Sequence, residues 1–154
     1  MSALPQAPAP RLAASRPVRR ILLATDLSGA SSAAANQAIS LARDLRAELL
    51  VVSVIDPSTR QPGPKVARMD QRRAARELAA QAVVMLGRRS GVDVRFLVWE
   101  GEPGPAIVEA AAAERVDMVV VGTRGLGSVE RIVLGSVSDH VVRHAPCPVL
   151  IARA

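Results

Sequence analysis

Residues 116–136 read VDMVVVGTRGLGSVERIVLGS. Val116–Val121 is the most uniformly apolar string of the chain and predicts a strand that is buried on both faces. Gly122–Leu134 is a loop with three glycines, and Ser136–His144 predicts a short helix. A strand that leads through a glycine-bearing loop to the start of a helix places backbone N–H groups where they can bind an anion. The stretch therefore predicts an α/β fold with a phosphate site after this strand.

Strand and helix patterns alternate on both sides of this stretch. Further strands are predicted over Arg19–Thr25, Glu48–Ile55, Val92–Trp99 and Pro148–Ala152. Further helices are predicted from Ser31, as the capping residue, to about Ala47, over Val66–Arg89, and from Pro105 or a neighbour to about Glu114. This alternation predicts one doubly wound domain with five parallel strands in the order 3-2-1-4-5 and helices on both faces.

Composition excludes several classes of protein. The 154 residues suit one domain, and no apolar run is long enough to cross a bilayer, so no membrane partner is expected. Phe96 and Trp99 are the only Phe, Trp or Tyr residues, which argues against base-stacking binders of single strands. The single cysteine, Cys147, excludes an internal disulfide and a cysteine-based zinc site, and it fits a reducing, cytoplasmic location.

The net charge of +6 is concentrated at the N-terminus. The first twenty residues contain four arginines and no acid, so the rest of the chain carries only +2. A nucleic-acid partner is therefore not expected. Residues 1–17 predict a disordered tail, with an organelle transit peptide as the alternative, and residues 18–154 predict the folded domain.

A second basic cluster falls at helical spacing within the predicted helix Val66–Arg89. It consists of Arg68, Arg72, Arg73 and Arg76. We interpret it as a solvated helix face, with a phosphate-contacting face as the alternative.

The predicted topology places a ligand site outside the carboxyl ends of the first and fourth strands, where the winding reverses. Asp26 and Gly122 leave those two strands. Gly122 and Gly125 can adopt positive φ and let backbone N–H groups approach an anion. Gly135 and Ser136 stand where the last helix begins, and its dipole, its free N–H groups and the serine hydroxyl favour phosphate there.

Two other phosphate-binding patterns do not match. A Walker loop needs Gly-Lys-Ser/Thr, but the only lysine is Lys65, in a proline-rich loop. A dinucleotide fingerprint that starts at Gly125 would need a small residue where Glu130 stands, and it would follow the fourth strand rather than the first.

The glycine spacing resembles the ATP-binding signature of the universal stress protein family. That signature is glycine, two residues, glycine, nine residues, then glycine and Ser or Thr, and it is matched without a gap by Gly122, Gly125, Gly135 and Ser136. The resemblance extends over about Arg19 to Ala152. It includes the opening strand that ends in Ala24–Ser28, the second strand that ends in Val54–Asp56, and the closing strand Pro148–Ile151.

The resemblance implies a fold like that of the adenine-nucleotide alpha-hydrolases and an ATP-binding regulator or sensor of the stress response. It implies an adenine pocket at Ala24, Thr25 and Val54, ribose at Asp26, Val121 and Gly122 beside base and sugar, and phosphates among Arg124, Gly125, Gly135, Ser136 and Val137. The ligand is expected to be ATP or another adenine nucleotide. Mg²⁺ on its phosphates fits, although the sequence shows no dedicated carboxylate cage for it. The family commonly forms dimers through its closing strand, so a homodimer through residues 148–152 is expected.

Alternatives remain for the function and for single residues. The chain is not expected to be a dedicated enzyme, with slow ATP hydrolysis as the upper limit, because no catalytic base accompanies Asp26. A family member that acts only as an interaction module, without nucleotide, and an adenylate-transferring enzyme are the alternatives. His140 and His144 have metal-ligand spacing but no third ligand, and Cys147 is interpreted as a small buried apolar residue.

Overall fold

Five parallel strands form one sheet in the computed structural model, which describes residues 15–59, 63–123 and 135–153. The predicted tail, residues 1–17, lies mostly outside this part of the chain. The strands are β1 (Arg20–Ala24), β2 (Glu48–Ile55), β3 (Val94–Glu100), β4 (Met118–Gly122) and β5 (Val149–Ala152). Their order is β3-β2-β1-β4-β5, which confirms the predicted topology.

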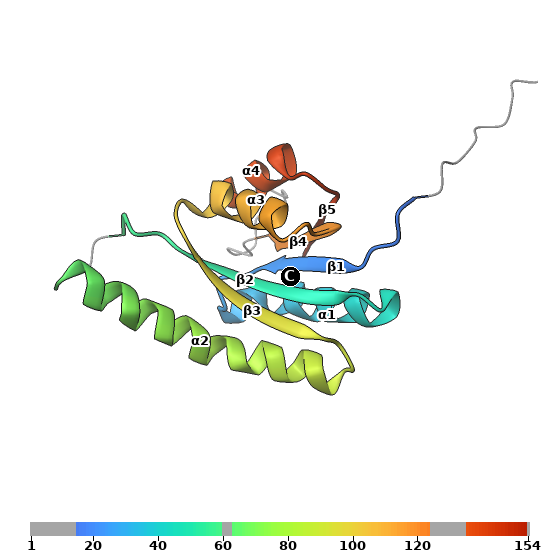
Figure 1. The fold of residues 1–154 in the computed structure, drawn as a ribbon, viewed down its shortest axis with the longest axis horizontal. Helices are drawn as coiled ribbons and strands as arrows, with labels where there is room; N and C mark the ends of the chain where they lie inside the picture. Colours follow the sequence, from blue (N-terminus) through green and yellow to red (C-terminus); the bar gives the residue numbers. More distant parts are fainter. Residues whose placement is uncertain (1–14, 60–62, 124–134, 154) are drawn as a thin grey trace, which may run out of the picture.

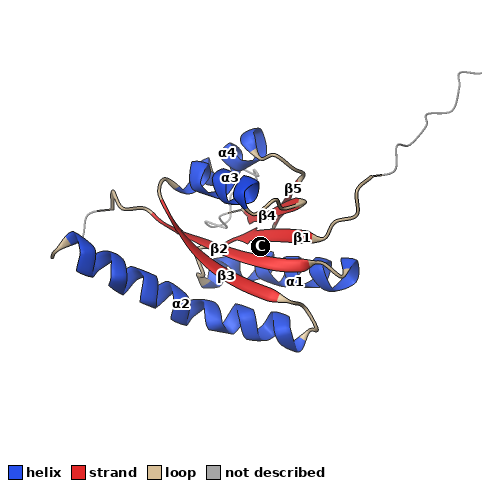
Figure 2. Ribbon diagram, viewed as in Figure 1, coloured by secondary structure: helices blue, strands red, loops and turns tan. Residues whose placement is uncertain are grey.

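Helices cover both faces of the sheet (Figures 1 and 2). They are α1 (Ser32–Leu45), α2 (Lys65–Arg89), α3 (Pro103–Ala113) and α4 (Ser136–His144), with a short 3-10 turn, η1 (Gly29–Ser31), before α1. Helices α1 and α2 lie on one face, and α3 and α4 lie together on the other. No helix in the described ranges is both long and apolar enough to cross a membrane.

The central strands bury their side chains on both faces. Ile21 and Leu23 of β1 pack toward α1, whereas Leu22 between them packs toward α3 and α4, and all three are fully buried. This alternation explains why the predicted strands are continuously apolar rather than apolar at every second position.

Several element boundaries differ from the predicted ones by one or two residues. β3 begins at Val94 instead of Val92, because Val92 still belongs to the turn after α2 and donates its N–H to the Gly87 carbonyl. α3 begins at Pro103, within the predicted start at Pro105 or a neighbour, and proline suits a first helical turn. β5 forms an edge of the sheet and pairs only with β4 among the described strands.

Candidate functional site

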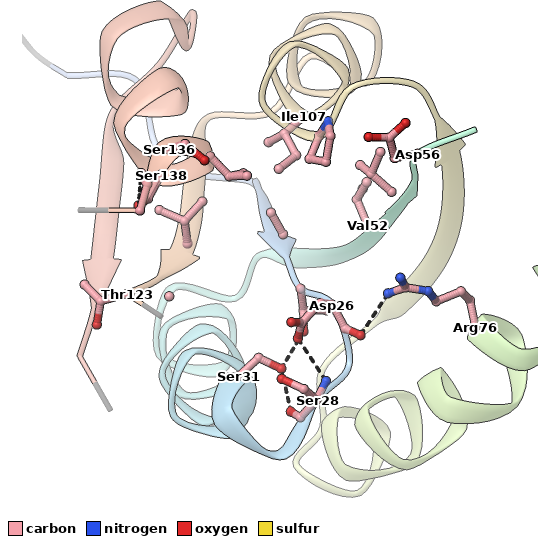
Figure 3. A pocket seen from close by; sticks show the side chains of 18 of the residues that line it. Asp26, Ser28, Ser31, Val52, Asp56, Arg76, Ile107, Thr123, Ser136 and Ser138 are labelled. Carbon is pink, nitrogen blue, oxygen red and sulfur yellow. Dashed lines mark hydrogen bonds between the residues drawn. The ribbon is translucent and has the colours of Figure 1, made fainter. Parts of the chain in front are cut away.

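A cavity of about 480 Å³ opens at the carboxyl ends of β1 and β4, at the predicted switch point (Figure 3). Nine of the eleven predicted site residues line it: Ala24, Thr25, Asp26, Val54, Val121, Gly122, Gly135, Ser136 and Val137. The other two, Arg124 and Gly125, lie outside the described residues. Segments that are distant in the sequence thus meet around one space, and the roles predicted for these residues stay predictions.

A chain of hydroxyl groups holds the loop after β1. The Thr25 hydroxyl, on a side chain that is almost fully buried, donates to Ser31 Oγ at 2.8 Å and accepts the N–H of Leu27 at 3.0 Å. Ser31 Oγ in turn donates to the carbonyl of Ser28 at 2.7 Å. The predicted capping role of Ser31 is wrong, because it precedes α1 but its side chain makes no capping hydrogen bond and stabilises the loop instead.

Asp26 lies at the cavity rim with an exposed side chain. Its Oδ1 accepts the N–H of Ser28 at 2.9 Å, which fixes the carboxylate relative to its own loop. The next residue, Leu27, has φ of 63°, in the left-handed region that side chains of this kind rarely adopt. The loop therefore stores strain at the switch point, as functional loops often do.

The start of α4 forms another wall of the cavity. Gly135 precedes the helix, no side chain in the described parts of the chain caps it, and the first intrahelical bond runs from the Asp139 N–H to the Gly135 carbonyl at 2.9 Å. N–H groups in the first turn of a helix have no intrahelical acceptor, and the dipole makes this end attractive to anions. The acid in this turn, Asp139, is paired with Arg143 at 3.0 Å. This wall therefore suits a phosphate group.

The expected use of positive φ at Gly122 does not occur. Gly122 belongs to β4 and pairs in register with Ala152, so its backbone is that of a strand. A Cβ at this position would lie 3.4 Å from the Cβ of Ala34 on α1. The sheet and α1 thus leave little more than van der Waals space at Gly122, which also lines the cavity.

Two residues of the basic cluster also line the cavity, so its interpretation as a solvated face is wrong for them. Arg72 donates to the Asp56 carbonyl at 2.7 Å, and Arg76 donates to the Asp26 carbonyl at 2.8 Å. Arg73, by contrast, pairs with Glu100 on partly exposed side chains. The remaining lining residues that sequence reasoning did not assign to the ligand are Ser28, Ser31, Val52, Asp56, Thr59, Pro103, Ile107, Thr123 and Ser138.

The Asp56 side chain is engaged locally. Hydrogen bonds from the hydroxyl and backbone N–H of Ser58 hold the pKa of Asp56 below its ordinary value. The group is therefore an ionised hydrogen-bond acceptor at the end of β2, and it is poorly suited to act as an acid.

The histidine pair and the cysteine lie away from the cavity lining. The rings of His140 and His144 stack with centroids 4.2 Å apart. In the described parts of the chain, no group of three or more His, Cys, Asp or Glu side chains is arranged to hold a metal ion. Cys147 is half-buried and packs against the α3 and α4 side of the core, and burial raises the pKa of its thiol.

The universal stress protein family model matches residues 17–153. The chain belongs to the universal stress protein family. A family member from Thermus aquaticus is 39% identical over 140 residues, covering 88% of this chain and 98% of its own. The universal stress protein MJ0531 of Methanocaldococcus jannaschii is 32% identical over 139 residues, covering 88% of this chain and 82% of its own.

Solved structures of the family share the fold. The universal stress protein UspA from Lactobacillus plantarum aligns with a TM-score of 0.77 at 26% identity, over 90% of this chain and all of its own. A universal stress protein in complex with cAMP aligns at 0.70 and 24% identity, over 90% of this chain and 98% of its own. The universal stress protein from Archaeoglobus fulgidus in complex with dAMP aligns with a TM-score of 0.65 at 20% identity. The alignment covers 89% of this chain and 99% of that protein. At these identities, the similarity to the last two proteins shows a shared fold.

Proposed function

We propose that this chain binds an adenine nucleotide, ATP above all, in the cavity at the switch point and acts as a nucleotide-dependent regulator or sensor. The observation that carries the proposal is the meeting of three chemically different walls around about 480 Å³, a volume within the range of small-molecule sites. One wall is apolar, one carries the Asp26 carboxylate, and one is the start of α4, which no described side chain caps.

Each wall suits one part of the nucleotide. The base would lie among Ala24, Val54 and Val121, with the main chain of Val54 reading its edge. Asp26 would accept hydrogen bonds from the ribose hydroxyls, since an ionised carboxylate is an acceptor only. The phosphates would lie against Gly135–Val137 at the start of α4, together with Arg124 and Gly125 of the glycine loop.

The arrangement favours holding the nucleotide over consuming it. Hydrolysis needs a group that orients or deprotonates water, and a cation that stabilises the leaving charge. The described acids at the cavity are Asp26 and Asp56; the first is assigned to ribose and the second is engaged by Ser58. We expect at most slow turnover. Mg²⁺ would bind through the phosphates rather than through a protein cage.

Calorimetry on purified protein, stripped of any ligand it carries, tests the proposal with ATP, AMP and GTP. We expect saturable binding of ATP, and at least tenfold weaker binding by Asp26→Asn, because the amide replaces one charged acceptor. Asp44→Asn is the matched control, since Asp44 is an exposed acid paired with Arg43 on α1. Absence of binding by the wild type would favour the interaction module. Mass spectrometry of the nucleotide that co-purifies would identify the adenylate.

A homodimer through β5 accompanies this proposal. β5 is an edge strand with half-buried apolar side chains at Val149, Leu150 and Ile151. A parallel edge strand with such side chains, paired on one side only among the described strands, favours association with a second copy of the same surface.

A further inference from the structure

Two arginines on one face of α2 reach the loops that follow β1 and β2. Arg76 Nη1 donates to the Asp26 carbonyl at 2.8 Å, as Figure 3 shows, and to Ser53 Oγ at 2.9 Å. Arg72, one helical turn earlier, donates from Nη1 to the Asp56 carbonyl at 2.7 Å. Both side chains are half-buried and line the cavity. One helix therefore holds the backbone on the ribose side and on the base side of the proposed site.

Ser53 shows that the contact of Arg76 is built into the core. Its side chain is fully buried in β2, and the residues on either side of it in the strand, Val52 and Val54, are apolar. A buried hydroxyl needs a hydrogen-bond partner. Arg76 supplies one, and its rigid, branched guanidinium donates from the same nitrogen to the Asp26 carbonyl.

The Asp26 carbonyl belongs to the peptide group that enters the strained residue Leu27. The N–H of the same peptide group donates to Thr25 Oγ1 at 3.0 Å, and its oxygen accepts from Arg76. Both ends of this peptide plane are therefore held, and Leu27 keeps its φ of 63°. Without Arg76 the peptide plane can rotate, Leu27 can relax, and the Asp26 carboxylate then moves with the loop.

The geometry points to Arg72 and Arg76 as positioning residues that act through the backbone of the two ligand loops. This inference rests on the proposed function. Arg76 holds Asp26 for the ribose hydroxyls, and Arg72 holds the end of β2, where Val54 meets the base. Each arginine thus sets the selectivity for a different part of the nucleotide.

Binding of ATP and of its 2′,3′-dideoxy analogue to Arg76→Met tests the ribose role. We expect ATP to bind about tenfold more weakly than to the wild type, and the analogue, which lacks the hydroxyls, to bind within about twofold. The preference for ATP over the analogue then falls about tenfold. Arg73→Met is the matched control on the same helix, and it should leave both affinities unchanged because Arg73 pairs with Glu100 instead.

Arg72→Met should give the complementary result. We expect its preference for ATP over GTP to fall while its preference for ATP over the dideoxy analogue stays as in the wild type. A general loosening of the fold would lower all three affinities together in either variant. Equal loss for all ligands, or unchanged preferences in both variants, would overturn the positioning roles.

Arg76→Met leaves the Ser53 hydroxyl buried without its donor, so the variant can lose stability for a reason unrelated to ligand. The same measurement in a Ser53→Ala background removes that hydroxyl, and Arg76→Lys keeps the charge. We expect the double variant Arg76→Met with Ser53→Ala to lose the preference for ATP over the dideoxy analogue. We expect Arg76→Lys to keep part of that preference. Thermal unfolding is recorded for both variants. A wild type that binds no adenine nucleotide overturns the proposed function together with this inference. Wild-type binding with an unchanged ribose preference in Arg76→Met overturns the inference alone.

Discussion

Gly135→Ala separates ligand contact from fold stability at the start of α4. Gly135 has φ of −63° and ψ of 160°, an extended backbone that alanine adopts without strain. An added Cβ would have Ser138 Oγ as its nearest neighbour, at 3.7 Å, which is ordinary van der Waals distance. Neither conformation nor packing in the described structure therefore requires glycine here. In the proposed site, glycine is required because a phosphate approaches the backbone here.

The stability change follows from two opposing terms. Alanine is a poorer residue than glycine before a helix, by about 0.5–1 kcal/mol, whereas loss of unfolded-chain freedom stabilises by about 0.4–1 kcal/mol. The free energy of unfolding should therefore change by no more than about 0.5 kcal/mol. A methyl group in the space of a phosphate should cost about 1–3 kcal/mol of binding, which raises the dissociation constant for ATP by roughly fivefold to 150-fold.

Calorimetry with ATP and with adenosine, together with urea unfolding, measures both quantities. Adenosine lacks phosphates, so its affinity for Gly135→Ala should match that for the wild type. Gly29→Ala is the control, because Gly29 has no atom within 4 Å of an added Cβ and does not line the cavity. The reasoning is refuted if ATP binds Gly135→Ala as tightly as the wild type, or if ATP and adenosine lose affinity equally.

Three further substitutions test the fold and the assembly. Burial opposes ionisation of Glu48, but hydrogen bonds from Arg95 and Arg20 outweigh it and hold its pKa below the ordinary 4.5. The ionised Glu48 carboxylate therefore stabilises the fold above pH 4.5, and this stabilisation is lost as the pH falls below that value. Glu48→Gln should lower the free energy of unfolding by about 1–2 kcal/mol at neutral pH. The difference between the two proteins should become smaller in acid. Gly87→Ala should destabilise by about 1–3 kcal/mol in urea unfolding, because its Cβ would lie 2.5 Å from Val94 Cγ2 in the core; a wild-type midpoint would contradict this. Val149→Lys should convert dimers to monomers in sedimentation while far-ultraviolet circular dichroism stays that of the fold, and persistent dimers would remove β5 as the interface.

The strands and their order were predictable because burial on both faces leaves a plain mark in the sequence. Ile21–Leu23 and Val119–Val121 are apolar without interruption because helices cover both sides of the sheet. Right-handed crossovers then leave few orders, and the order locates the switch point. The glycine spacing and Asp26 could be placed at one site for that reason.

The contributions of Arg72, Arg76 and Ser31 could not be predicted with the same reasoning. Helical spacing shows that the arginines share a face, but the neighbours of that face depend on how α2 crosses β2 and β3. Ser31 has a hydroxyl that serves a helix cap and a loop equally well, and local sequence does not decide between them. Ser53 was the one sequence feature that could have indicated the role of Arg76. A hydroxyl in an otherwise apolar stretch of a buried strand needs a hydrogen-bond partner from elsewhere in the fold.

The amino end of the sheet carries ion pairs that serve stability. Arg20 and Arg95 both pair with Glu48, and Arg95 also pairs with Glu114. Asp117 accepts the backbone N–H of Arg20 at 2.9 Å, next to the point where β1 and β4 begin. These groups link β1, β2, β3 and the end of α3 on the side of the sheet that is remote from the cavity.

The carboxyl end is built in the opposite way. Thr25, Ser31 and Arg76 bond to backbone and hydroxyl groups around the cavity. A strained Leu27 reduces stability, so it persists because the core and the amino end supply the difference. Substitutions at the two ends should therefore have separable effects. Glu48→Gln should lower the free energy of unfolding and leave ATP affinity intact. Gly135→Ala should leave the free energy of unfolding nearly unchanged and weaken ATP binding. Such a division lets the binding end be shaped by its ligand rather than by the needs of folding.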